Sequence, residues 1–203
     1  MALLDWIAPE SGLRVEGEGV WLRPPRAQDF AAWRELRAAS RAFLQPWEPT
    51  WPADDLSRAA FRRRLIAYAR DREAGAAYPF FVFREVDGAL SGGITLSNVR
   101  RGVAQMGSVG YWCGKAYARN GHTLAAVRAL SDFAFRTLGL HRLEAACIPE
   151  NAPSRRLLAK AGFAEEGFAR AYLKINGAWR DHVLFGLTTP LQALDGPDEG
   201  VSV

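Results

Sequence analysis

The segment that most restricts the possible folds is YWCGKAYARNGHTLAAVRAL, which runs from Tyr111 to Leu130. Its first residues are typical of the end of a buried strand, and its last residues repeat apolar side chains at helical spacing. A short basic turn with two glycines, Gly114 and Gly121, lies between them. Because the first N–H groups of a helix have no partners within the helix, such a turn often holds a phosphate. The segment predicts an anion site, although a purely structural connection fits the same residues equally well.

Two familiar phosphate-binding motifs do not fit this turn. A P-loop requires glycine, four residues and then Gly-Lys-Ser/Thr, and the turn has no such run. A dinucleotide-binding turn requires Gly-x-Gly-x-x-Gly within repeated βαβ units. The stretch GKAYARNG lacks that spacing, and predicted hairpins surround it. Nucleoside triphosphates and dinucleotides are therefore poor candidates for the anion.

Composition is that of an ordinary soluble globular protein. The chain has 203 residues, enough for one domain with a sizeable core, and 24% of them are charged. The net charge of +4 suits an anionic cofactor, but it is too small and too scattered to predict direct nucleic-acid binding. The N terminus lacks a basic region followed by a long apolar run, and no apolar segment reaches the length of a membrane span. We expect a cytoplasmic protein without a membrane partner.

The two cysteines, Cys113 and Cys147, lie in apolar surroundings and lack the spacing of metal ligands. We expect two buried thiols in a reducing compartment, and no metal site.

Periodicity and turn residues give the order strand, two helices, three strands, helix, strand, helix and two strands. Strands are expected at 20–23, 106–114 and 141–148 and in hairpins at 78–99 and 168–187, and helices at 30–39, 54–75, 123–138 and 151–163. The Asn176-Gly177 pair is the strongest hairpin signal in the chain. Residues 43–52, FLQPWEPTWP, have prolines spaced too closely for a helix or strand, so we expect a loop.

This mixture of elements predicts an α+β (mixed α/β) fold. We expect one domain over residues 1–203, with its core at about 20–187. The residues after Pro190 are acidic and contain glycine and proline, so we expect a flexible tail there.

The region HRLEAACIPENAPSRRLLAKAGFAEEGFARAYLKINGAWRDHVLFGL, residues 141–187, carries a family resemblance. It resembles the C-terminal half of the GNAT acyltransferases, and closely the RimJ/RimL type, the ribosomal-protein N-terminal acetyltransferases (ribosomal-protein-alanine N-acetyltransferase among them). The matching pieces are HRLEA, PENAPSRRLLAKAGFAEEG and INGAWRDHVLFGL. Upstream, the pieces GYWCGKAYARNGHTLAAVRAL, GGITLSNV, FLQPWEPTWP and LRPPRAQDFAAW continue the resemblance in the family's order. It covers the chain from about Val20 to Leu187.

The resemblance implies the GNAT fold: a central, mostly antiparallel sheet, with helices on both faces and one parallel strand pair that splays apart. The splayed strands would be 108–113 and 142–148, with acetyl-CoA in the gap between them. The implied cofactor-binding residues are Tyr111, Trp112 and Cys113 through their backbone, Asn151 at the pantetheine arm, and Arg119, Asn120, Gly121, His122, Thr123 and Leu124 at the pyrophosphate. Of the family's signature in this turn only Gly121 matches, while Ala118 and Thr123 depart from it.

The resemblance also names catalytic candidates. Ser154 would be the general acid for the departing thiolate, with Tyr172 as an alternative acid; an ordinary helix cap and a packing aromatic are the structural readings of these residues. Backbone N–H groups near Trp112 or Cys113 could stabilise an oxyanion. The candidate bases are Glu48, Asp54 and Glu85, because the position of the glutamate that RimL-type enzymes are thought to use is occupied here by Leu173. His122 is expected at the surface or the cofactor, and His141 and His182 in structural roles.

Three functions remain open at this point. The first is acetyl-CoA-dependent acetylation of the N-terminal α-amino group of a protein, such as a ribosomal protein, with residues 45–52 covering the acceptor side. The second is the same chemistry on a small amine such as an amino acid or antibiotic. The third is a non-catalytic acyl-CoA-binding module. We expect a monomer or a weak homodimer.

Overall fold

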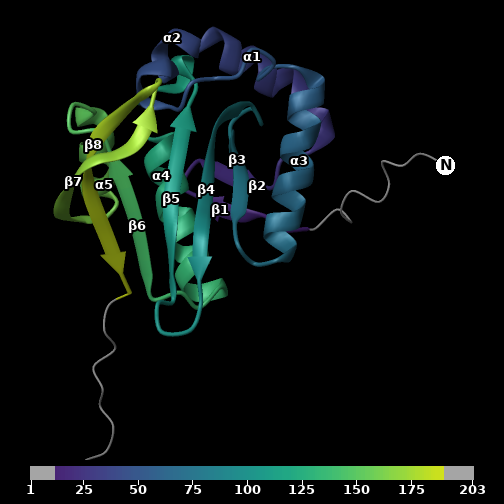
Figure 1. Ribbon diagram of the computed structural model, residues 1–203. Helices are drawn as coiled ribbons and strands as arrows, with labels where there is room; N and C mark the ends of the chain where they lie inside the picture. The colour runs from purple at the N-terminus through teal and green to yellow at the C-terminus, as the bar shows by residue number, and fades with distance from the viewer. Residues whose placement is uncertain (1–11, 190–203) are drawn as a thin grey trace, which may run out of the picture.

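The computed structural model describes residues 12–189 and contains one eight-stranded sheet (Figure 1). The strands are β1 (Val15–Gly17), β2 (Val20–Arg23), β3 (Tyr78–Arg84), β4 (Leu90–Arg100), β5 (Met106–Cys113), β6 (Arg142–Cys147), β7 (Ala164–Ile175) and β8 (Ala178–Thr188). Their order in the sheet is β1-β2-β3-β4-β5-β6-β8-β7. Within the described residues β5 and β6 are the one parallel pair, and the other neighbours are antiparallel. The predicted mostly antiparallel sheet with one parallel pair is confirmed.

Helices cover both faces of this sheet. They are α1 (Phe30–Ala39), α2 (Arg41–Leu44), α3 (Arg58–Glu73), α4 (His122–Asp132) and α5 (Ala152–Lys160). Helices α4 and α5 pack on one face, which we call the α4 face, and pass behind the strands in Figure 1. Helices α1 and α3 pack on the opposite face, the α1 face, where Trp33 and Phe61 meet Phe81 and Phe83 of β3.

Burial along the strands shows where each face is covered. The five residues from Pro79 to Phe83 in β3 are buried without alternation, as expected for a strand with helices on both sides. Strand β6 alternates instead: Leu143, Ala145 and Cys147 are buried on the α4 face, while the residues between them are half-buried. The α1 face is therefore well covered over β3 and less covered over β6.

The parallel pair separates soon after it forms. Strands β5 and β6 pair only at Met106 with Arg142, Gly107 with Leu143 and Ser108 with Glu144. Beyond these positions β5 continues to Cys113 and β6 to Cys147 without pairing to each other. The two strands thus enclose a V-shaped gap, as the resemblance implied, and we call it the fork.

Most predicted elements are confirmed, and three boundaries are corrected. Helix α3 begins at Arg58 and not near Asp54, because the Ser57 hydroxyl accepts the Ala60 N–H (3.0 Å) and caps the helix there. Helix α4 ends at Asp132, and residues 133–137 continue as a π-helical turn. Strand β7 starts at Ala164, four residues before the predicted hairpin.

The prediction for residues 43–52 is wrong, and one strand was missed. The expected loop at 43–52 contains the end of α2 and a 3-10 turn, Gln45–Trp47, because Pro46 stands in the first turn, where its missing N–H is tolerated. Strand β1 was not predicted, because Val15–Gly17 is too short to show periodicity. The expected flexible tail after Pro190 lies outside the described residues.

No helix in the described part of the chain is long and apolar enough to cross a membrane.

Candidate active site

The edge of β5 that faces the fork presents free backbone groups. The Gly114 N–H donates to the Ser91 carbonyl in β4 (2.9 Å), so Cys113, the residue before it, turns its own N–H and C=O away from β4. Because the backbone N–H and C=O groups of an antiparallel strand alternate in direction, those of Tyr111 also point into the fork, while those of Trp112 point toward β4. The same geometry explains Gly92, where a Cβ atom would clash with the Trp112 carbonyl oxygen. A linear ligand with amide groups could pair with Tyr111 and Cys113 as an added strand would.

The turn after β5 brings the N terminus of α4 to the mouth of the fork. Gly121 precedes the helix with φ +83°, and Arg119 also has a positive φ of +67°. No side chain caps α4 among the described residues, and its helical hydrogen bonds begin with the Ala125 N–H, which donates to the Gly121 carbonyl (3.0 Å). The N–H groups of residues 122–124 thus project from the helix end. Unpaired N–H groups and a positive helix dipole suit a phosphate.

The two side chains that open α4 lie on different sides. Burial raises the pKa of the Cys113 thiol, and the nearby Thr123 hydroxyl opposes this increase. His122 lies toward the turn between β3 and β4. Burial lowers the pKa of the His122 ring, Arg84 lowers it further, and Asp87 opposes both. The buried His122 Nδ1 has no hydrogen-bond partner among the described residues.

Helix α5 supplies the opposite wall of the fork. Its cap is Asn151, whose Oδ1 accepts the Ser154 N–H (3.1 Å), and Pro153 stands in the first turn. The Ser154 hydroxyl in turn lies 2.7 Å from the Tyr111 hydroxyl on β5. Tyr111, Asn151 and Ser154, all predicted site residues, are thus brought together, and their hydrogen bonds span the fork.

The β7–β8 hairpin forms a rim beside the fork on the α1 face. A bulge shifts its register between Ala169 and Leu173, and Ala171 there has φ +45° and donates its N–H to Asp181 Oδ1 (2.7 Å). Tyr172 is exposed and packs edge-on against the His182 ring at 5.6 Å. The predicted alternative acid Tyr172 therefore lies on the rim, whereas the Ser154 hydroxyl pairs with Tyr111.

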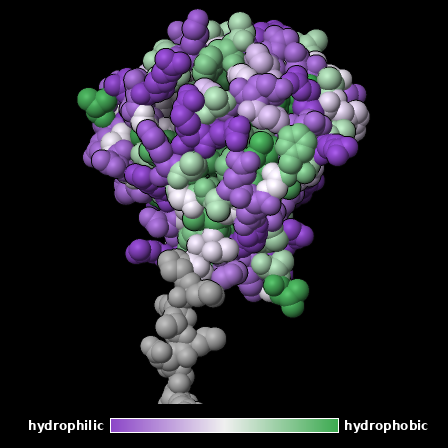
Figure 2. All heavy atoms as spheres, turned by 90° about the vertical axis from the view of Figure 1, so that its left-hand side faces the viewer, coloured by the Kyte–Doolittle hydropathy of each residue, from purple (hydrophilic) through white to green (hydrophobic). Residues whose placement is uncertain are grey.

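The outer side of this hairpin is partly apolar. Figure 2, which views the molecule from the side of β7, shows hydrophobic surface near its centre bordered by hydrophilic side chains. Exposed large apolar residues of the hairpin are Phe168, Tyr172, Leu173 and Trp179. A shallow groove of about 370 Å³ lies between α5 and the β7–β8 strands, with Phe163, Phe185 and Arg155 in its lining. This groove lies outside the fork.

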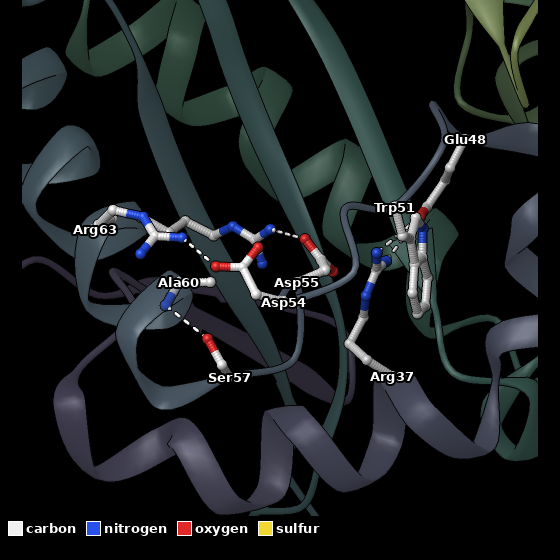
Figure 3. Close-up of polar contacts among 9 residues, drawn as sticks. Arg37, Glu48, Trp51, Asp54, Asp55, Ser57, Ala60 and Arg63 are labelled. Carbon is white, nitrogen blue, oxygen red and sulfur yellow. Dashed lines mark hydrogen bonds and ion pairs between the residues drawn. The ribbon is translucent and has the colours of Figure 1, made fainter.

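Glu48, a predicted base, is held in a clamp with Arg37 and Trp51 (Figure 3). Arg37 donates to both Glu48 carboxylate oxygens (2.7 Å each), and Trp51 Nε1 donates to Oε2 (2.7 Å). The Arg37 guanidinium lies 4.1 Å from the Trp51 ring centre and 4.9 Å from that of Trp112 on β5. The Glu48 carbonyl also accepts the Asn176 N–H at the β7–β8 turn (2.9 Å). The clamp therefore joins α1, the segment 45–51, β5 and the hairpin.

The other predicted bases lie elsewhere. Asp54 is exposed and pairs with Arg63, also exposed, beside the start of α3 (Figure 3). The pKa of Asp54 is lowered, mainly by this hydrogen bond. Glu85 is exposed in the turn between β3 and β4 and donates its backbone N–H to Gly19.

Two further residues of the site had no clear sign in the sequence. Arg37 of α1 belongs to no motif, yet it organises the clamp. Glu144 pairs in register with Ser108 at the last position before the fork opens, and it accepts a hydrogen bond from Arg142 (3.2 Å). Since its neighbours Leu143 and Ala145 face the α4 face, the Glu144 side chain lies on the α1 face. The HRLEA motif predicts the strand, but it does not indicate on which face of the sheet the Glu144 side chain lies.

Taken together, the residues fit an acyl-CoA ligand. The fork offers backbone groups for an amide-bearing arm, and the end of α4 offers N–H groups for a pyrophosphate. The unpartnered His122 Nδ1 beside this turn adds a nitrogen that a polar ligand group could meet. The chain's own residues thus provide, at the expected places, the features that coenzyme A needs.

Comparison with known proteins agrees with this geometry. Residues 20–164 match the family model of the acetyltransferase (GNAT) domain. The chain is 37% identical over 164 residues to the [ribosomal protein uS5]-alanine N-acetyltransferase of Escherichia coli, covering 80% of this chain and 84% of that one. Its structure resembles Mycobacterium smegmatis RimJ in complex with CoA-disulfide, with a TM-score of 0.83, 34% identity and 88% of each chain covered.

A further similar structure is the ribosomal-protein-S5-alanine acetyltransferase of Vibrio fischeri, with a TM-score of 0.81 and 31% identity, covering 88% of this chain and 97% of that one. The protein belongs to the GNAT family and is an N-acetyltransferase that uses acetyl-CoA.

Proposed function

We propose that this N-acetyltransferase acetylates the α-amino group at the N terminus of a protein, and that a ribosomal protein is the first acceptor to test. The observation that carries the acetyl-CoA side of this proposal is the fork, which opens after three paired positions beside the N terminus of α4. The acceptor side is supported by the relatives, whose names specify ribosomal protein uS5 or S5 and its alanine.

Different residues around the fork would bind different parts of acetyl-CoA. When bound, acetyl-CoA supplies an acetyl thioester that a neutral amine can attack. The N–H groups of residues 122–124 would hold the pyrophosphate, and the backbone of Tyr111 and Cys113 would align the pantetheine arm along β5. Asn151 caps α5 and so fixes the first turn of that helix at the fork.

Proton transfer is assigned to Ser154. Its hydroxyl lies at the fork within 2.7 Å of Tyr111 and can protonate a departing thiolate as the general acid. Tyr172 on the β7 rim is the alternative acid. The backbone N–H of Cys113 points into the fork and can donate to an oxyanion, because β4 does not use it.

The acceptor amine would enter on the α1 face. That face is less covered over β6 and is bordered by the clamp on one side and by the Tyr172 rim on the other. A protein α-amino group titrates near pH 7.7–8, so a weak base or a water molecule suffices to free it of its proton. Glu48 has both carboxylate oxygens engaged, so we assign it to holding the acceptor side in place, while Glu144 at the fork is an acid to test as base.

The test is direct transfer of acetyl from acetyl-CoA. The pure protein would be incubated with peptides that carry the N termini of ribosomal proteins, the same peptides with a blocked α-amine, and a panel of amino acids and amine antibiotics. Free thiol and peptide mass report the transfer. We expect a single acetyl group on the free α-amine of a peptide.

Other outcomes contradict the proposal in different ways. Transfer only to small amines would replace the acceptor class and keep the chemistry. Tight CoA binding in calorimetry without transfer to any amine would overturn the proposed activity.

A further inference from the structure

Tyr111 and Ser154 form a hydrogen bond that the proposed binding roles do not explain. The two residues are 43 positions apart in sequence and lie on opposite walls of the fork, with their hydroxyl oxygens 2.7 Å apart. The Ser154 backbone is fixed separately, since its N–H donates to Asn151. The bond to Tyr111 therefore acts on the Ser154 side chain, in particular on where its hydroxyl proton points.

The acidities of the two hydroxyls favour Tyr111 as the donor of this hydrogen bond. A phenol is a stronger acid than an aliphatic alcohol, and each hydroxyl has one proton and two lone pairs. Burial raises the pKa of Tyr111, and the bond with Ser154 opposes this by less, so the phenol stays protonated at neutral pH. If Tyr111 donates to Ser154 Oγ, the serine proton is left free to point at a third group.

The Ser154 hydroxyl has an inner side, next to the core, and an open side, toward the fork. On the inner side, the buried Cys147 thiol lies near Ser154: burial raises the pKa of this thiol, and the nearby serine hydroxyl opposes the increase. On the open side, the fork is where the backbone of Tyr111 and Cys113 would align a thioester. A serine proton directed there is placed for transfer to sulfur.

We infer that Tyr111 is a positioning residue for Ser154, one whose hydroxyl donates to Ser154 Oγ and directs the serine proton into the fork. This rests on the proposed acetyl transfer. As the carbon–sulfur bond breaks, its electron pair goes to sulfur, and the proton moves from Ser154 Oγ to that sulfur. The Tyr111 O–H stabilises the serine oxygen until Ser154 regains, through water, the proton that the amine nitrogen loses as the amide forms.

The test compares Tyr111→Phe, Ser154→Ala and the double variant, with Tyr78→Phe as the control. Phenylalanine keeps the buried ring and removes only the hydroxyl, and Tyr78 lies on β3 against Phe133, away from the fork. We expect Tyr111→Phe to lower kcat by roughly 10-fold with KM for acetyl-CoA changed by less than about 2-fold, since the general acid alone contributes about 100-fold or more. In the Ser154→Ala background the same change should have no further effect, which is the coupling that two groups of one unit show.

A second acyl donor separates positioning from packing. S-phenyl thioacetate has a thiol that is a much stronger acid and leaves without a proton, so the loss caused by Tyr111→Phe should disappear with it. An unchanged kcat in Tyr111→Phe, a loss that is equal in the Ser154→Ala background, or a loss that persists with S-phenyl thioacetate would each overturn the inference. A wild-type protein that transfers acetyl to no amine would overturn the proposed function itself, and this inference with it.

Discussion

Gly114 and Gly121 in the turn after β5 are glycines for different physical reasons. At Gly114 a Cβ atom would clash with the Leu36 side chain of α1, so Leu36 would have to move to admit a side chain there. At Gly121 a Cβ atom would meet no described atom within 4 Å, but φ is +83°, a conformation that side chains disfavour. The open space beside Gly121 is therefore available to an anion at the end of α4.

Replacing Gly121 with aspartate tests this placement. The carboxylate would stand at the site of the pyrophosphate, and we expect CoA binding to weaken by roughly 10- to 100-fold, about 1.4–2.8 kcal/mol. Gly121→Asn is the matched control, because asparagine has nearly the same shape and tolerates a positive φ equally well but carries no charge. Calorimetric titration with CoA gives both constants. Equal weakening in the two variants, or none in either, would remove the pyrophosphate from this turn.

Arg37 and Arg63 form ion pairs whose environments differ, as Figure 3 shows. The side chains of Arg37 and Glu48 are 9% and 19% exposed, whereas those of Arg63 and Asp54 are 64% and 53% exposed. Removing Arg37 leaves a mostly buried carboxylate unpaired. We expect Arg37→Ala to lower the free energy of unfolding by about 3 kcal/mol, and Arg63→Ala to have a much smaller effect, because solvent screens that exposed pair. Urea unfolding measures both, and equal effects would contradict the clamp.

The clamp also makes a prediction about Glu48 as a base. If Glu48 only holds the acceptor side in place, Glu48→Gln and Arg37→Gln should change stability and kcat in parallel. If Glu48 removes the proton of the amine, Glu48→Gln alone should lower kcat strongly and remove the acidic limb of its pH profile. Steady-state kinetics across pH separates the two roles.

At the scale of elements, strand β5 connects every part of the site. Its backbone faces the fork at Tyr111 and Cys113, its Trp112 side chain meets the clamp, and its end leads into the turn before α4. Strand β6 diverges from it, so the edge of β5 stays available to a ligand. The fork is thus a consequence of register: three paired positions and then separation.

We expect the alkylation rate of the Cys113 thiol, at the end of β5, to depend on whether CoA occupies the fork. Burial raises the pKa of Cys113, so less thiolate is present at neutral pH, and we expect its alkylation to be slow at pH 7 and to speed up as pH rises. Bound CoA should slow the reaction further, because the arm would lie along β5. Mass spectrometry of the Cys147→Ser variant with N-ethylmaleimide follows Cys113 alone. Alkylation at the same rate with saturating CoA would contradict the position of the arm.

Local signals explain which elements could be predicted. Helix α1 was predicted at its observed bounds because Phe30 and Trp33 repeat at helical spacing, and Asn176-Gly177 placed the β7–β8 turn. Strand β1 has three residues and no pattern of its own; it exists because it pairs with β2. The 3-10 turn at Gln45–Trp47 forms where the chain must bend back from α2 toward the clamp.

At the scale of the whole molecule, the site combines residues that are distant in sequence. Local pattern predicted the turn at Gly121 and the start of α5, and the family resemblance made Asn151 and Ser154 site candidates, which the structure places beside the fork. The clamp and the Tyr111–Ser154 bond could not be predicted, because they depend on how α1, β5 and α5 pack on the sheet. Sequence pattern reports the neighbours within an element, whereas side chains that meet across elements are fixed by the register of the sheet.

The two faces of the sheet carry different parts of the site. The α4 face carries the large apolar cluster and both helix ends that border the fork. The α1 face carries the clamp, and the β6 residues on this face are only half-buried. Cofactor and acceptor would therefore reach the fork from different sides of one sheet, which lets each be bound without displacing the other.

The most direct test of the central claim is residue-resolved amide hydrogen exchange with and without CoA. If the cofactor lies in the fork, the amides of Tyr111 and Cys113 and those of residues 122–124 should exchange more slowly with CoA. Trp112, which faces β4, serves as the internal control and should change little. If CoA binds while the exchange of these five amides stays unchanged, the fork between β5 and β6 is not the cofactor site.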